Sequence, residues 1–191
     1  MAAKIPTKVR LDRAAISLFA KLQVDGASTR EIAALAEIAE GTLYRHYSSK
    51  EEMALSLFIR HYLALGEALN EALDQAATLE AGLKALVKRA YKQFDDDPEL
   101  CAFLILHQHR YLSAIEEGEP TPVQVLRRAI AQAIKAGDLP KQNVEDAVAM
   151  VLGVLLQPAV AHTYGQLKGT LTKRSKRVAQ AAFAVLQSAK A

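Results

Sequence analysis

The feature that most constrains this chain is the spacing of its apolar residues. They recur three and four positions apart through most of the 191 residues, which is the spacing of one face of an α-helix. Runs of alternating β-branched residues, which are typical of strands, are nearly absent. A chain of this length can bury a sizeable core without a metal or disulfide staple, and its single cysteine, Cys101, excludes an internal disulfide. We therefore predict an all-α protein.

Local start and stop signals divide the chain into about nine helices. Ser28 and Glu31 have the Ser-x-x-Glu spacing of a capping box, and Ser49 with Glu52 repeats it. Pro122 suits the first turn of a helix. The predicted helices span residues 6–22, 29–36, 40–47, 49–75, 78–94, 99–114, 121–137, 143–164 and 171–190.

The excess positive charge is confined to the beginning of the chain. Residues 1–50 carry eight Lys or Arg and five Asp or Glu, which accounts for the whole net charge of +3. A basic unit on a neutral body indicates nucleic acid at one end of a protein. We predict a DNA-binding domain at 1–50 and a larger helical ligand-binding and dimerisation domain at 51–191.

The longest apolar run, residues 147–156, has ten residues. A bilayer-spanning helix needs about 20, so we expect this run to lie in a buried helix and not in a membrane. Charged residues break any signal-peptide core near the N-terminus. We expect a soluble, intracellular and therefore cytoplasmic protein.

Three short helices followed by a long one suggest a helix-turn-helix. In that motif the second helix of a pair lies in the major groove and the first crosses the DNA backbone. The pair would be residues 29–36 and 40–47. Only the groove helix needs exposed side chains that can meet bases and phosphates, and the segment Thr42-Leu43-Tyr44-Arg45-His46-Tyr47 with nearby Lys50 supplies them.

These segments resemble a known family. Leu18-Phe19, Ser28-Thr29-Arg30-Glu31-Ile32-Ala33, Gly41-Thr42-Leu43-Tyr44-Arg45-His46-Tyr47 and Ser49-Lys50-Glu51-Glu52 are similar to the DNA-binding domain of TetR/AcrR-family regulators. The resemblance covers residues 10–55. It implies a ligand pocket among the middle helices and a dimer interface formed by the last two.

The resemblance also implies roles by position. Ser28 and Thr29 would hold a phosphate at the start of the second helix, and Thr42, Arg45 and His46 would face the groove. Tyr44 and Tyr47 would lie between groove and core with at least one hydroxyl on a phosphate, and packing inside the three-helix unit is the alternative for both. Lys50 would lie on the DNA backbone. The expected DNA-binding residues are Ser28, Thr29, Glu40, Thr42, Tyr44, Arg45, His46, Tyr47 and Lys50.

Three positions depart from the family pattern. Gln23 stands where a helix-ending glycine is usual, so the left-handed cap of the first helix is lost or passes to Gly26. Glu37 stands at the usual glycine of the turn between the second and third helices. Ala39 stands where a serine usually caps the recognition helix, which costs about 1 kcal/mol of helix stability. Glu40 suits the helix dipole but repels phosphate, although a glutamate can accept from cytosine.

The remaining chain shows no enzyme motif and no metal-ligand pattern, and we expect no cofactor. Polar or aromatic residues on apolar helices are candidates for a small-molecule pocket, each with packing in the core as the alternative. The ligand candidates are His61, Tyr62, Tyr91, Phe94, Phe103, His107, Gln157 and His162. The predicted homodimer interface contains Val144, Val148, Val151, Leu152, Leu155, Ala181 and Val185, with an ordinary internal core as the alternative.

We therefore predict a transcriptional regulator, a repressor that a small-molecule ligand releases from a pseudo-palindromic site in double-stranded DNA. The alternative is a helical interaction protein that has kept the fold of the N-terminal domain but lost specific DNA binding. Glu37, Ala39 and Glu40 are the residues that argue for this alternative.

Overall fold

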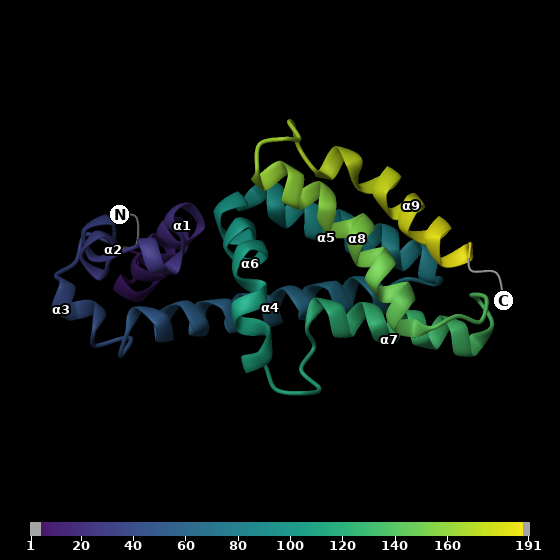
Figure 1. Ribbon diagram of the computed structural model, residues 1–191, viewed down its shortest axis with the longest axis horizontal. Coiled ribbons are helices and arrows are strands. Elements are labelled where there is room, and N and C mark those ends of the chain that lie inside the picture. The colour runs from purple at the N-terminus through teal and green to yellow at the C-terminus, as the bar shows by residue number, and fades with distance from the viewer. Residues whose placement is uncertain (1–4, 189–191) are drawn as a thin grey trace. The chain divides into compact units, whose positions relative to one another are not determined.

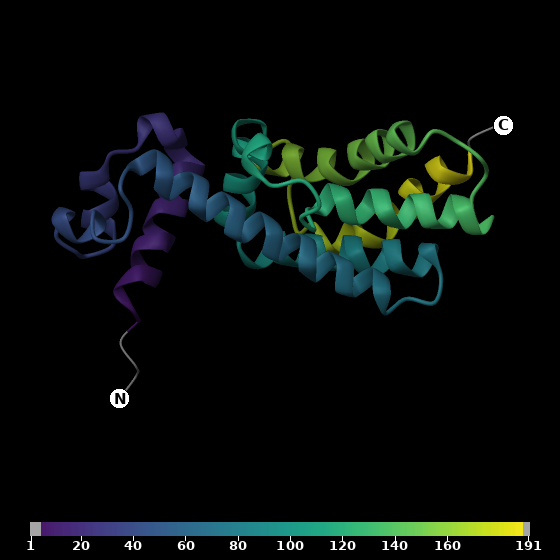
Figure 2. The same ribbon diagram turned by 90° about the horizontal axis from the view of Figure 1, so that it is seen from below.

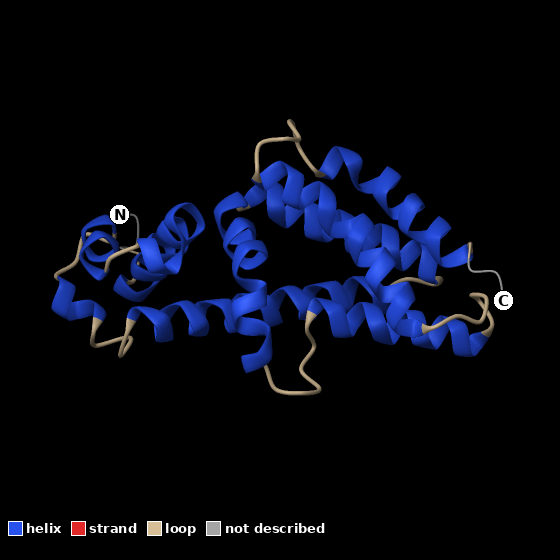
Figure 3. Cartoon of the chain, viewed as in Figure 1, coloured by secondary structure: helices blue, strands red, loops and turns tan. Residues whose placement is uncertain are grey.

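The computed structural model describes residues 5–188, and every regular element in that range is a helix (Figures 1 and 3). This confirms the predicted all-α fold. The α-helices are α1 (Thr7–Gly26), α2 (Thr29–Leu35), α3 (Glu40–Leu43), α4 (Lys50–Asp74), α5 (Leu79–Asp96), α6 (Pro98–Tyr111), α7 (Pro122–Ala136), α8 (Val144–Thr163) and α9 (Ser175–Gln187), with 3-10 turns η1 (Leu112–Ala114) and η2 (Thr172–Arg174).

The chain forms two compact units. The head contains the residues up to His61 together with Glu99–Ile115, and the body contains Tyr62–Pro98 and the chain from Glu116 onward. The helix α4 therefore contributes its first half to the head and its second half to the body. Each unit has its own core.

The head core is built from apolar faces of α1, α4 and α6. Phe19 of α1, Phe58 of α4 and Phe103 of α6 are fully buried. The ring of Phe103 lies 5.9 Å from that of Phe19 and 6.4 Å from that of Phe58. Aromatic rings at these distances attract one another beyond the effect of their buried area. Through this packing α6 belongs to the head, although α5 of the body separates it from α4 in the sequence.

The predicted capping box of Ser28 and Glu31 is present in the head, whereas that of Ser49 and Glu52 is present only in part. The Ser28 hydroxyl accepts from the Glu31 amide at 3.2 Å, and the Glu31 carboxylate accepts from the Ser28 amide at 3.0 Å. At the start of α4, Ser49 accepts from the Glu52 amide at 3.0 Å, while the Glu52 carboxylate accepts from the amide of Ser48 at 3.2 Å. These bonds satisfy amides that have no partner inside the helix.

The body is a bundle in which α9 packs on α5 and α8, and α7 packs on α8 (Figures 1 and 2). The ends of α7 follow the predicted signals. Thr121 caps it by accepting from the Gln124 amide at 3.2 Å, Pro122 stands in the first turn, and Gly137 closes it with a φ of 85°.

One glycine of α4 is required by a close approach within the body. A Cβ atom on Gly66 would lie 1.7 Å from the carbonyl oxygen of Pro120. The backbone that connects α6 to α7 therefore lies directly against α4, and no larger residue fits there without movement of that backbone.

Four predicted helix boundaries are wrong. The helix expected over 6–22 extends to Gly26 across the non-helical residue Gln23. The helix expected over 40–47 ends at Leu43, the helix expected over 99–114 ends at Tyr111 before η1, and the helix expected from Leu171 begins at Ser175 after η2. In these last three places bonds to the third preceding residue tighten the chain into 3-10-like turns, which sequence periodicity does not distinguish from α-helix. The predicted end of the last helix at 190 lies outside the described residues.

The helix α8 is long and apolar enough to cross a membrane by length and composition, but only 28% of its most apolar window is buried within the chain. The expectation of a buried helix therefore holds for only one side of α8. One side of α8 packs in the body core and the other side is open, with Met150 49% exposed.

Candidate nucleic-acid and ligand sites

The helix-turn-helix of the head presents a short recognition segment. The helix α2 packs on α1 and α3, and Ile32 and Leu43 are fully buried between them. After α3 the chain continues as a tight turn, because the amides of Arg45 and His46 donate to the carbonyls of Thr42 and Leu43 at 3.3 and 2.9 Å. The segment that can enter a groove is thus one α-helical turn followed by one tighter turn.

Polar side chains gather on the outer side of this segment. Tyr44, Arg45 and His46 are exposed, and Thr42 is half-buried. The guanidinium of Arg45 donates to the Thr42 hydroxyl at 3.0 Å. This contact holds Arg45 over the end of α3 while its other donors remain free for a partner.

The start of α2 is already occupied by carboxylates. Thr29 donates to the Glu40 carboxylate at 2.6 Å, and Tyr44 donates to the Thr29 hydroxyl at 3.4 Å. The Ser28 hydroxyl donates to Glu31 at 2.6 Å, and the hydrogen bonds from Ser28 hold the pKa of Glu31 below its usual range. Glu31 and Glu40 therefore both stand where Ser28 and Thr29 were expected to hold a phosphate.

Tyr47 differs from the expectation of a DNA contact, because it lies in the head core with only 4% of its surface exposed. Its hydroxyl donates to Asp12 at 2.7 Å and accepts from Lys8 at 2.6 Å. Burial and the bond to Asp12 raise the pKa of Tyr47. A phosphate contact by this hydroxyl is therefore ruled out in this conformation, and packing inside the three-helix unit is the observed role.

Asp12 is a residue that the sequence reasoning missed. Its side chain is 12% exposed, and besides Tyr47 it accepts from Arg60 of α4 at 2.6 Å and pairs with Lys8 at 3.4 Å. The available signal was its position on α1, one turn before the buried Ile16. A carboxylate on an apolar helix face indicates a buried partner.

Lys50 lies at the rim of the same surface. Its ammonium group donates to the carbonyl of Ala27 at 2.7 Å and reaches that of Asp25 at 3.5 Å. Lys50 therefore ties the start of α4 to the connection between α1 and α2. It also lines a surface hollow together with Ser28, Thr29 and Tyr44.

Two of the three departures from the family pattern fall at unusual backbone conformations. Gln23 has a φ of 61° and Glu37 a φ of 54°, while Gly26 has no positive φ. The left-handed cap expected for α1 is thus lost. Gln23 interrupts the helix internally with a non-helical φ of 61° and ψ of 168°, and α1 ends at Gly26 before Ala27, whose backbone is extended. Ala39 is the N-cap residue of α3 and provides no side-chain hydrogen bond to it, as expected.

The ligand candidates of the head lie on α4 and α6. Phe103 and His107 are buried with their ring centres 4.9 Å apart. His107 Nδ1 lies 2.9 Å from the Phe103 carbonyl oxygen, and burial lowers the pKa of His107. His61 at the end of the head portion of α4 is half-buried.

The ligand candidates of the body are only partly gathered together. Phe94 and His162 meet edge to face at 5.1 Å. The Tyr91 hydroxyl donates to the Leu155 carbonyl at 2.9 Å, one turn before Pro158, which lies inside α8. Burial raises the pKa of Tyr62 to about 12, and Gln157 is exposed.

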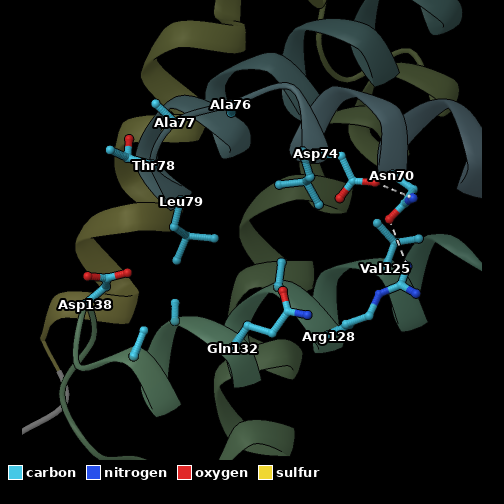
Figure 4. A pocket seen from close by; sticks show the side chains of 14 residues that line it. Asn70, Asp74, Ala76, Ala77, Thr78, Leu79, Val125, Arg128, Gln132 and Asp138 are labelled. Atoms are coloured by element: carbon cyan, nitrogen blue, oxygen red, sulfur yellow. Dashed lines mark hydrogen bonds between the residues drawn. The ribbon is translucent and has the colours of Figure 1, made fainter.

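A separate hollow of about 240 Å³ lies between the end of α4, the start of α5 and α7 (Figure 4). The guanidinium of Arg128 donates to the side-chain oxygen Oδ1 of Asn70 at 2.8 Å, and the side-chain amide of Asn70 donates to Asp74 at 2.9 Å. The polar side chains on this side of the rim are therefore hydrogen-bonded to one another. The hollow was not predicted, and the eight ligand candidates are not among the residues that line it.

The predicted interface residues divide into two groups. Val148, Val151 and Leu155 are 3%, 0% and 8% exposed and belong to the core of the body, so these three were wrongly assigned to a partner. Val144, Leu152 and Val185 are half-buried, and Ala181 is exposed. The open side of the helix, called here the outer α8 face, contains Ala149, Met150, Gly153 and Leu156.

Asp95 behaves as a structural residue and not as a cation ligand. It accepts from the amides of Leu171 and Thr172 at 2.8 and 2.9 Å and from the Thr172 hydroxyl at 2.5 Å. The described residues contain no group of His, Cys, Asp and Glu arranged to hold a metal ion. The carboxylate instead accepts hydrogen bonds from the start of η2, the turn that precedes α9.

Comparisons with known proteins agree with this arrangement. Residues 13–57 match the sequence profile of the family described as "Bacterial regulatory proteins, tetR family". No curated protein matches the sequence of the chain.

Solved structures share the fold over nearly the whole chain. The fatty acid degradation regulator FadR from Bacillus halodurans is 22% identical with a TM-score of 0.79, covering 94% of this chain and 95% of its own. FadR from Bacillus subtilis in complex with stearoyl-CoA is 18% identical with a TM-score of 0.78, covering 96% and 100%. A TetR family transcription regulator from Marinobacter aquaeolei VT8 is 17% identical with a TM-score of 0.76, covering 94% and 95%.

Proposed function

The chain belongs to the tetR family of bacterial regulatory proteins, whose profile matches the DNA-binding head, and on this premise we propose that it is a homodimeric repressor of transcription released from DNA by a ligand. The observation that carries this proposal is the recognition segment. Arg45 and His46 project outward from a backbone that the buried residues Leu43 and Tyr47 hold in place. Donors held on a rigid support can read bases in the major groove.

The outer α8 face supports the homodimer. Met150 and Leu156 are 49% and 37% exposed, and exposed apolar patches of this kind mark interaction surfaces. Pairing of this face with a second copy across a two-fold axis buries it. Such a dimer carries two recognition segments, so its operator is pseudo-palindromic with half-sites about one DNA turn apart.

For the effector we propose a fatty acyl thioester of coenzyme A. The support is the likeness in fold to FadR from Bacillus subtilis, whose structure contains stearoyl-CoA. His61, Tyr62, Tyr91, Phe94, Phe103, His107, Gln157 and His162 remain the predicted ligand residues. The ligand releases DNA only if it binds more tightly to a conformation whose recognition segments do not fit the operator.

The decisive experiment is a selection of genomic fragments with the purified protein at low salt, followed by titration of the recovered site. We expect a pseudo-palindromic sequence whose binding weakens when an acyl-CoA is added. Recovery of no common sequence would instead favour an interaction protein without specific DNA binding. Release of the operator by no acyl-CoA would contradict the effector class but not the regulator.

A further inference from the structure

Two buried polar side chains lie one helical turn apart on α6, inside the head. His107 is 3% exposed and Tyr111 is 7% exposed. Their rings are nearly parallel, with an angle of 14° and a centroid distance of 6.3 Å. Because residues four apart share a helix face, both side chains face the same part of the head core.

Each of these side chains has a polar atom without a hydrogen-bond partner among the described residues. These atoms are Nε2 of His107 and the hydroxyl oxygen of Tyr111. A carbonyl oxygen only accepts, so the 2.9 Å contact between His107 Nδ1 and the Phe103 carbonyl places the proton on Nδ1. Nε2 is then an acceptor that needs a donor, and the Tyr111 hydroxyl is a donor that needs an acceptor.

The surroundings of the pair are aromatic and apolar. Phe58 lies 5.5 Å from Tyr111, and Phe103 lies 4.9 Å from His107. Burial lowers the pKa of His107, so the imidazole is neutral near pH 7. Buried polar groups in native proteins are met by a protein group or an ordered water in nearly all cases, and a single partner that both donates and accepts meets this pair.

This requirement distinguishes between classes of ligand. A carboxylate is charged near pH 7, so it must either bring that charge into an apolar site or first take up a proton, and both cost free energy. An uncharged acyl compound with an N–H a few bonds from its carbonyl meets both groups. The thioester carbonyl and the neighbouring amide of an acyl-CoA have this arrangement.

We propose that His107 and Tyr111 recognise the thioester–amide segment of the effector and discriminate against free fatty acids. The Tyr111 hydroxyl donates to a ligand carbonyl, and a ligand amide donates to His107 Nε2. This inference rests on the proposed function, because it names the part of the proposed effector that the pair contacts.

The test is isothermal titration calorimetry of the full chain with three probes that share one acyl chain. The probes are dodecanoyl-CoA, the dodecanoyl thioester of N-acetylcysteamine, and dodecanoate. We expect both thioesters to bind and dodecanoate to bind at least about tenfold more weakly, which corresponds to the loss of one good interaction. Binding of dodecanoyl-CoA alone would place recognition on the nucleotide and overturn the inference.

Two variants test the named atoms. Tyr111→Phe and His107→Leu should each weaken both thioesters by about tenfold and leave the affinity for dodecanoate unchanged. Tyr164→Phe and His109→Leu are matched controls, because both of these residues are exposed, and they should bind all probes like the original chain. Equal affinities in all four variants would overturn the inference while leaving the effector class intact.

The ligand-free protein provides a second measurement. Tyr111→Phe removes a buried hydroxyl without a protein partner, so its Tm should be unchanged or higher. A lower Tm together with unchanged thioester affinity would show that the hydroxyl has a structural role and would overturn the inference. Absence of thioester binding by the original chain would instead contradict the proposed effector class itself, together with this inference.

Discussion

The hydroxyl of Tyr47 donates to a carboxylate oxygen of Asp12 across 2.7 Å, joining the end of the recognition segment to α1. Arg60 of α4 donates to the other oxygen of the same carboxylate at 2.6 Å. One nearly buried carboxylate therefore connects three parts of the head. Because the recognition segment is short, these bonds contribute to its position as well as to stability.

Removing the Tyr47 hydroxyl should destabilise the head. A hydrogen bond to a charged group contributes about 1.5–3 kcal/mol, so we expect Tyr47→Phe to lower the free energy of unfolding by that amount and to weaken operator binding. Tyr44→Phe is the control, since Tyr44 is 52% exposed and its loss should change stability by less than about 0.5 kcal/mol. Denaturant unfolding measures both. Equal stability of the two variants would contradict the role of the Asp12 bond.

Glycine at position 37 should stabilise the protein. Glu37 has a φ of 54°, and a side chain in the left-handed region costs about 1–2 kcal/mol. The greater flexibility of glycine in the unfolded chain offsets part of the gain, so we expect Glu37→Gly to raise the free energy of unfolding by about 1 kcal/mol. Glu37→Ala keeps a Cβ and removes the same exposed carboxylate. A gain in the alanine variant as large as in the glycine variant would point to charge and not to backbone strain.

Arg45 and Lys50 should affect DNA binding differently. A bidentate contact to guanine discriminates by about 1–3 kcal/mol, so Arg45→Ala should relax the preference at one base pair in each half-site. Lys50 donates to the Ala27 carbonyl, and one further phosphate contact per subunit would change the salt slope of a dimer by about 2. We therefore expect Lys50→Ala to weaken binding to all sequences. Titration against the operator and random DNA at several salt concentrations separates the two effects.

Acid should weaken the attachment of α9 through Asp95. Partial burial raises the pKa of Asp95, but the hydrogen bonds from Thr172 and Leu171 lower it by more, so its pKa lies below the usual range. The stabilisation is therefore complete above the ordinary carboxyl pKa of about 4 and is lost as the pH falls through the lower folded value. Asp95→Asn should be less stable than the original chain at pH 7, and the gap should close in acid. A gap independent of pH would contradict this linkage, and Asp138→Asn, at an exposed position, is the control.

Neighbouring positions on α8 should separate dimerisation from folding. Met150 is 49% exposed and Val151 is 0% exposed. Met150→Glu should give a folded monomer in analytical ultracentrifugation, because the charge lies on the outer α8 face. Val151→Glu should unfold the body, because an unpaired buried charge costs about 4 kcal/mol or more. A dimeric Met150→Glu variant would place the interface elsewhere.

Local sequence patterns were sufficient to predict the helical architecture and several helix ends. The capping box of Ser28 with Glu31 and the cap of Thr121 before Pro122 could be predicted, because each depends on groups within four residues of one another. The location of the recognition segment could be predicted for the same reason. The apolar residues around it have the spacing of one helix face, and its polar side chains fall at the positions that this spacing leaves open to solvent.

Local sequence patterns do not predict which of two chemically equivalent residues faces solvent. Tyr44 and Tyr47 are three positions apart in one motif, yet Tyr44 is 52% exposed while Tyr47 is buried against Asp12, 35 positions away. Likewise, the apolar run of α8 does not reveal which of its sides the rest of the body covers. Burial depends on contacts between segments far apart in the chain, and local spacing contains no record of those contacts.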